Sequence, residues 1–209
     1  SVFNLAWTEN AARLTVNEKK NGYYSTFFKE FYVLLVGIML CLITASPLLF
    51  KVLINKQYED AYGLMSWLYV GVFFSSLVSF FGSIYVGEKK TKEVGISSMI
   101  GAVLNLIINL IFMKKFGVVI AAISTIISYF IILLYRAFDI KHYIVIKYNL
   151  KRIVVGFVLI LIIAVINNNF SWMRSCISVI IAVGYNAIYN RHFLGKIIKK
   201  MLRKEKNNV

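Results

Sequence analysis

The residues whose types and spacing favour binding chemistry are polar side chains that repeat along two apolar stretches. Gly101, Asn105 and Asn109 stand at i, i+4 and i+8, so they share one face of a helix. The next apolar stretch carries hydroxyl groups at a similar spacing, namely Thr125, Ser128 and Tyr129. Amides and hydroxyls of this kind either bond to one another where two membrane helices meet or face a water-filled cavity. Both interpretations are open.

Groups for catalysis, metal binding or nucleotide binding do not form a recognisable set. Neither histidine (His142, His192) lies in an apolar run, and the two cysteines show no metal-ligand spacing. Residues 82–89 approach a P-loop, but Glu88 stands at the lysine position. We therefore expect no catalytic residue, no metal and no cofactor.

Composition places these residues in a membrane protein. The chain has 209 residues, of which 59% are hydrophobic and 16% charged, with a mean hydropathy of +0.73. Soluble domains are about 45–50% apolar and about 25% charged. Soluble enzymes, disulfide scaffolds and disordered tails are excluded.

Six apolar runs without Asp, Glu, Lys or Arg are present, at 31–50, 62–86, 94–112, 116–135, 153–166 and 176–189. A helix of about 20 residues crosses the hydrocarbon core, and the last two runs span it only with flanking residues. The fold class predicted is therefore an all-α integral membrane protein with a six-helix transmembrane bundle.

Charge predicts the orientation. The net charge is +15, and 19 of the 24 Lys and Arg fall on one side if the six runs all cross. The positive-inside rule makes that side cytoplasmic, together with the C-terminus, and it removes the need for a nucleic-acid partner. We expect three parts: the end of a preceding helix and a cytoplasmic connection (1–30), the six-helix lobe (31–189), and a basic cytoplasmic tail (190–209). The chain begins without methionine, so we expect it to continue upstream.

The stretch 88–136 resembles a known family. A basic turn is followed by Gly101, Ala102, Asn105 and Asn109, and then by a second set: Gly117, Ala121, Ala122, Thr125, Ser128 and Tyr129. This order is similar to the C-terminal half of bacterial polysaccharide biosynthesis proteins, the flippases of O-antigen or capsule repeat units. They belong to the multidrug/oligosaccharidyl-lipid/polysaccharide exporter superfamily. Ile120 departs from the pattern, where a second glycine is usual. The similarity covers residues 1–140.

The resemblance implies one lobe of a two-lobed, alternating-access carrier in the bacterial inner membrane. Such a carrier moves a polyprenyl-diphosphate-linked oligosaccharide from the inner to the outer leaflet. The implied partners are this substrate, membrane lipids, an N-terminal lobe of the same chain, and polysaccharide polymerase machinery. The implied protein is not an enzyme.

The resemblance also implies site residues. Arg13, Lys29 and Arg136 stand at helix ends where a diphosphate would dock, or they only set the topology. Asn105, Asn109, Thr125, Ser128 and Tyr129 would contact sugar, or hold helices together. Gly37 and Pro47 would form a hinge, unless Pro47 merely ends its helix.

Three alternatives remain. A cation-coupled drug exporter or a peptidoglycan-precursor flippase of the same superfamily would share the architecture. A membrane-bound polysaccharide polymerase or acyltransferase is disfavoured by short outer loops. A purely structural membrane partner would need no polar stripe.

Overall fold

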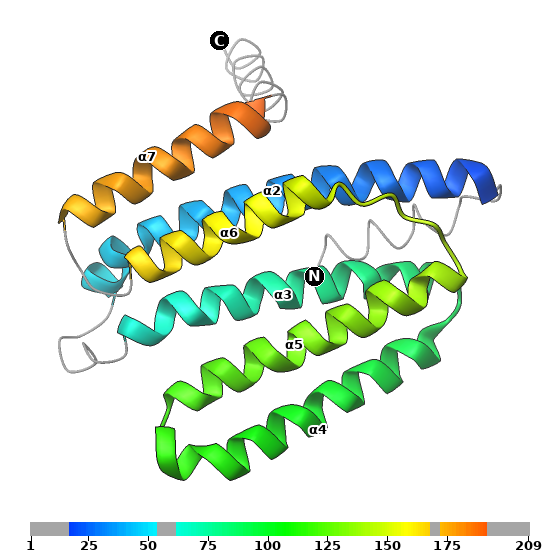
Figure 1. The fold of residues 1–209 in the computed structure, drawn as a ribbon, viewed down its shortest axis with the longest axis horizontal. Coiled ribbons are helices and arrows are strands. Elements are labelled where there is room, and N and C mark those ends of the chain that lie inside the picture. The colour runs from blue at the N-terminus through cyan, green and yellow to red at the C-terminus, as the bar shows by residue number, and fades with distance from the viewer. Residues whose placement is uncertain (1–16, 54–61, 168–171, 192–209) are drawn as a thin grey trace, which may run out of the picture.

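The computed structural model describes residues 17–53, 62–167 and 172–191, and these form six α-helices with one short 3-10 helix (Figure 1). The helices are α2 (Asn17–Leu53), α3 (Tyr62–Gly87), α4 (Thr91–Phe116), α5 (Val119–Asp139), α6 (Leu150–Ile166) and α7 (Trp172–Tyr189), with η2 (Ile140–His142) after α5. The predicted all-helical bundle is confirmed. Residues 1–16, with Arg13, and the tail beyond residue 191 lie outside the described residues.

The helices lie roughly side by side and alternate in direction (Figure 1). α3 lies between α2 and α5, α4 packs on α5, and α6 and α7 pack on α2. Four helices, α2 to α5, contain segments long and apolar enough to cross a membrane. The ammonium group of Lys90 lies 5.3 Å from the centre of the Tyr143 ring, so the α3–α4 turn and the segment after α5 meet at one end. Which side of the membrane this end faces stays a prediction.

α2 is longer than the apolar run that it contains. It begins at Asn17 and continues past Pro47 to Leu53, so the alternative that Pro47 merely ends the helix is wrong. Proline lacks the N–H that would bond to the carbonyl four residues earlier. The hydroxyl of buried Ser46 donates to that carbonyl, on Ile43, at 2.7 Å. The preceding residue thus supplies the hydrogen bond that Pro47 leaves unmade.

Aromatic side chains fill the contact between α2 and α3. Phe31 stacks on Phe80 with ring centroids 5.0 Å apart, and Phe28 meets Phe80 edge-on at 5.4 Å. On α6, the ring of Phe157 stacks on that of Phe73, with the ring centroids 6.1 Å apart. Such pairs add about 0.5–1.5 kcal/mol each beyond their buried area. This cluster makes α2 and α3 the centre of the fold.

In contrast, α4 is almost entirely exposed along its length. Ser97 and Gly101 are its only buried residues, whereas Leu106 and Leu110 are 59% and 69% exposed. In a membrane these apolar side chains meet lipid or another helix, because hydrocarbon tails are as apolar as leucine. α4 is therefore attached to the bundle through its partner α5.

The contact between α2 and α7 depends on Gly37, one of the two predicted hinge residues. The amide of Asn186 donates to the Gly37 carbonyl at 3.3 Å, and Asn190 donates to the Val33 carbonyl at 3.3 Å. A Cβ on Gly37 would overlap the amide groups of both asparagines. Gly37 thus lets the two helices approach closely, and its role as a hinge stays a prediction.

Replacing Gly37 with leucine is expected to lower the free energy of unfolding by about 1–3 kcal/mol, the usual cost of overpacking a tight contact. The readout is thermal unfolding of the detergent-solubilised protein. Gly22→Leu on the same helix is the control, because nothing lies within 4 Å of a Cβ there. Equal melting of the two variants would contradict the close contact.

Candidate functional site

Arg136 forms the densest polar site in the described part of the chain. Its side chain is 2% exposed and bonds to both α3 and α4 from the last turn of α5. Nε donates to the Ser97 hydroxyl at 2.9 Å, and Nη1 donates to the Val78 carbonyl at 2.7 Å. Nη2 donates to the Ser98 hydroxyl at 2.9 Å and to the Val94 carbonyl at 3.2 Å. One guanidinium group therefore joins three helices.

Arg136 is placed by the residues around it. Gly82 leaves room on α3, because a Cβ there would lie 2.7 Å from Nη1. The C-terminal turn of a helix also favours a cation, since its carbonyl dipoles point outward. Beside it, the Tyr85 hydroxyl donates to the Asp139 carboxylate at 2.8 Å and to the Arg136 carbonyl at 3.3 Å. Among the described residues no carboxylate pairs directly with the guanidinium, so neutral oxygen atoms satisfy the charge.

Sequence reasoning did not identify most of this site. In the sequence Gly82 belongs only to an incomplete P-loop, and Ser97 and Ser98 belong to no recognisable motif. Arg136 itself was predicted as a docking residue for a diphosphate. In this structure four of its five N–H groups bond to protein, and contact with substrate stays a prediction.

The asparagine and hydroxyl stripes meet between α4 and α5. The Asn105 amide donates to the Ser124 hydroxyl at 3.2 Å and to Thr125 Oγ1 at 3.4 Å. Asn109 donates to the carbonyl and to the side-chain oxygen of Asn105, both at 3.0 Å. Asn105 thus bonds across to α5, which is one of the two interpretations of the pattern, whereas Asn109 bonds to Asn105 within α4.

Two other residues of the second stripe lie nearby. Ser128 is 4% exposed, and no hydrogen-bond partner is present for its buried Oγ in the described structure. Tyr129 is half-buried and packs against the core. The opposing Gly101 is buried against Ile132, whose side chain would overlap a Cβ at residue 101. The small residue of the stripe therefore sets how closely α4 approaches α5.

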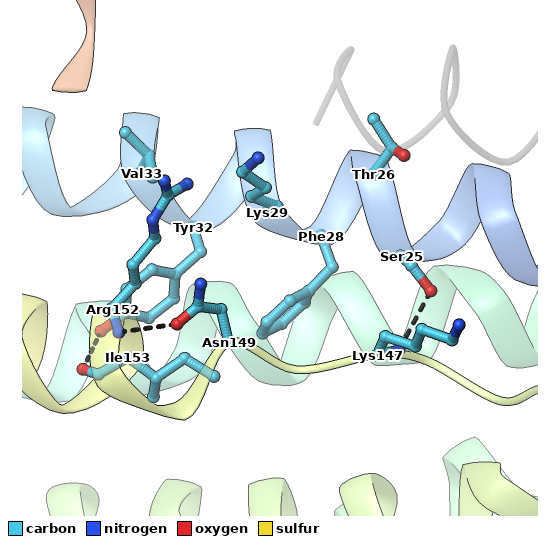
Figure 2. A pocket seen from close by; sticks show the side chains of 10 residues that line it. All are labelled: Ser25, Thr26, Phe28, Lys29, Tyr32, Val33, Lys147, Asn149, Arg152 and Ile153. Atoms are coloured by element: carbon cyan, nitrogen blue, oxygen red, sulfur yellow. Dashed lines mark hydrogen bonds between the residues drawn. The ribbon is translucent and has the colours of Figure 1, made fainter.

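Lys29 lies elsewhere, in a cleft between α2 and the start of α6 (Figure 2). The cleft has a volume of about 200 Å³. Ten residues line it: Ser25, Thr26, Phe28, Lys29, Tyr32, Val33, Lys147, Asn149, Arg152 and Ile153. It is distinct from the Arg136 site and from the asparagine stripe, so the structure does not gather the predicted site residues into one pocket.

No group of three or more His, Cys, Asp or Glu residues that could hold a metal occurs in the described ranges. Cys41 and Cys176 are free thiols.

A family model matches more than half of the chain. Residues 55–183 match the model described as lipid II flippase MurJ, a stretch that includes α3 to α6 and the first part of α7. Comparison with curated proteins finds no match, and neither does comparison with solved structures.

Replacing Arg136 with lysine is expected to lower the free energy of unfolding by about 1–3 kcal/mol, because an ammonium group cannot reach acceptors on both α3 and α4. Thermal melting measures the change. Arg174→Lys is the matched control, since Arg174 is exposed in the first turn of α7. Gly82→Ala should lower the free energy of unfolding of the native protein. In the Arg136→Lys variant the same substitution should lower that free energy only slightly further. Full additivity would show that Gly82 does not accommodate the guanidinium.

A double-mutant cycle tests the bond between α4 and α5. Asn105→Ala and Thr125→Val are expected to show a coupling energy of about 0.6 kcal/mol, a typical value for hydrogen bonds between membrane helices. The cycle is measured by thermal or denaturant unfolding in detergent. If the coupling is zero while substrate binding is lost, the two residues contact sugar instead.

Proposed function

The chain belongs to the family of the lipid II flippase MurJ, and on this premise we propose that it moves a lipid-linked precursor of a cell-surface glycan across the bacterial inner membrane. The single observation that carries the proposal is the family match over residues 55–183. The six-helix bundle supports it, because carriers are commonly built from two such lobes around a central site. A second helix lobe is the implied partner.

For the substrate, the peptidoglycan precursor is the first candidate. The family model is named for a lipid II flippase, and lipid II is a lipid-linked precursor of peptidoglycan. The O-antigen or capsule repeat unit is the second candidate, favoured by the ordered residues from Gly101 to Tyr129 that resemble polysaccharide flippases. Both substrates join a polyprenyl chain, a diphosphate and sugars, so one lobe architecture serves either.

We assign the predicted residues to stages of this transport. Arg13 and Lys29 attract the diphosphate to the membrane surface that the charge bias predicts to be cytoplasmic. The stripe Asn105, Asn109, Thr125, Ser128 and Tyr129 contacts sugar when α4 and α5 separate. Arg136 holds α5 to α3 and α4 before it meets the diphosphate, and Gly37 and Pro47 bend α2. Polymerase machinery would receive the product.

Complementation tests the proposal and identifies the substrate. The natural reading frame is expressed in two bacterial strains, one depleted of its lipid II flippase and one lacking its O-antigen repeat-unit flippase. Restored growth in the first, or restored surface polysaccharide in the second, is the expected result. Protein present in the membrane with neither phenotype restored would contradict the proposal, and increased drug resistance would then favour the exporter alternative.

A further inference from the structure

The cleft between α2 and α6 holds three cations that no carboxylate of the described residues neutralises. Lys29 comes from α2, Lys147 from the segment before α6, and Arg152 from the first turn of α6. No acid lines the cleft, and Glu30 is not among its residues. In the described part of the chain no carboxylate pairs with any of the three side chains. The cations are therefore available to an anion.

The walls of the cleft, in contrast, are fixed by hydrogen bonds. Ser25 Oγ accepts from the backbone N–H of Lys147 at 3.0 Å, and Asn149 Oδ1 accepts from that of Arg152 at 3.3 Å. The Tyr32 hydroxyl donates to the Ile153 carbonyl at 2.6 Å. Figure 2 shows these bonds, with the guanidinium of Arg152 extending to α2 beside Val33. The site is thus built before any ligand enters.

The start of α6 adds to the positive field. Asn149 caps this 17-residue helix, and its first turn contains no acid. The N–H groups at a helix N-terminus favour anions, phosphates above all. Burial raises the pKa of the neighbouring Tyr148 to about 12, so its phenol stays neutral and adds no negative charge. Cations and helix dipole together match the charge and oxygen-rich surface of a phosphate group.

The surroundings of the cleft match a lipid better than a soluble anion. Phe28, Val33 and Ile153 give its lining an apolar part. Outside it, Leu150 and Val154 of α6 are 70% and 57% exposed. Acyl or prenyl chains attached to a phosphate in the cleft would lie along these side chains, as lipids lie along membrane helices. Basic pockets at the membrane surface bind lipid head groups in this way.

We propose that this cleft is a binding site for the phosphate group of an anionic lipid, held by Lys29, Lys147 and Arg152. Two lipids carry that chemistry, an anionic phospholipid and a polyprenyl diphosphate. With a phospholipid the inference goes beyond the proposed function, whereas with a polyprenyl diphosphate it rests on that function and adds Lys147 and Arg152 to Lys29. Binding is measured without turnover, so it is tested separately from transport.

Native mass spectrometry of the protein in its natural reading frame, released from detergent, tests the site. Four probes are added separately: phosphatidylglycerol, polyprenyl diphosphate, zwitterionic phosphatidylcholine, and inorganic diphosphate. One or both anionic lipids are expected to bind at least about tenfold more tightly than phosphatidylcholine. Lys29→Gln and Arg152→Gln are each expected to weaken that binding about tenfold, the loss of one charge-assisted contact.

Lys151→Gln is the matched control, since Lys151 is exposed on the same turn but does not line the cleft. It removes the same charge and should change binding less than about twofold, which separates a site from diffuse attraction. Thermal melting confirms that each variant folds. The anionic lipid whose binding requires Arg152 identifies the source of the phosphate.

Three results would overturn the proposal. The first is that Lys151→Gln weakens lipid binding as much as Arg152→Gln does. The second is that phosphatidylcholine binds as tightly as both anionic lipids. The third is that the folded Arg152→Gln and Lys29→Gln variants bind the anionic lipids as tightly as the native protein does. Binding of inorganic diphosphate alone would overturn the lipid assignment. Failure of complementation in either bacterial strain would leave the binding result unaffected.

Discussion

The buried guanidinium of Arg136 is the interaction on which one half of the bundle depends. It satisfies its charge with oxygen atoms of Val78, Val94, Ser97 and Ser98, on two helices at once. A buried cation left without such acceptors costs several kcal/mol. The position of α4 and α5 against α3 is therefore tied to one side chain, and Gly82 keeps the space that this side chain occupies.

Different kinds of interaction attach the individual helices to the bundle. Aromatic packing joins α2 to α3, whereas amide hydrogen bonds and Gly37 join α2 to α7. On the other side, α4 is held by Asn105 and the buried Ser97 while most of its apolar surface stays exposed. Polar bonds thus fix the outer helices, because apolar contact alone gives no preference over lipid.

The sequence predicted the helices better than their contacts. Bilayer thickness fixes the length of an apolar run, so the six runs predicted six helices. The spacing of Asn105 and Asn109 predicted a polar face on one helix, and the next helix carried a second polar stripe that includes Thr125. Sugar binding and helix contact require the same groups, so the pattern could not distinguish them. Burial of Arg136 arises from α3 and α4 together, and local spacing cannot reveal it. Likewise, Lys29 was predicted, whereas Lys147 and Arg152 join it only through the fold.

Membership of a flippase family makes translocation the central claim, and transport in vesicles measures it most directly. The natural reading frame is reconstituted with a lipid-linked diphosphate precursor that carries a fluorophore on its sugar, and a membrane-impermeant quencher is added outside. We predict that vesicles containing the protein lose the fluorescence of the inner leaflet, while empty vesicles retain it. Equal retention in both, with folded protein present, would contradict the account.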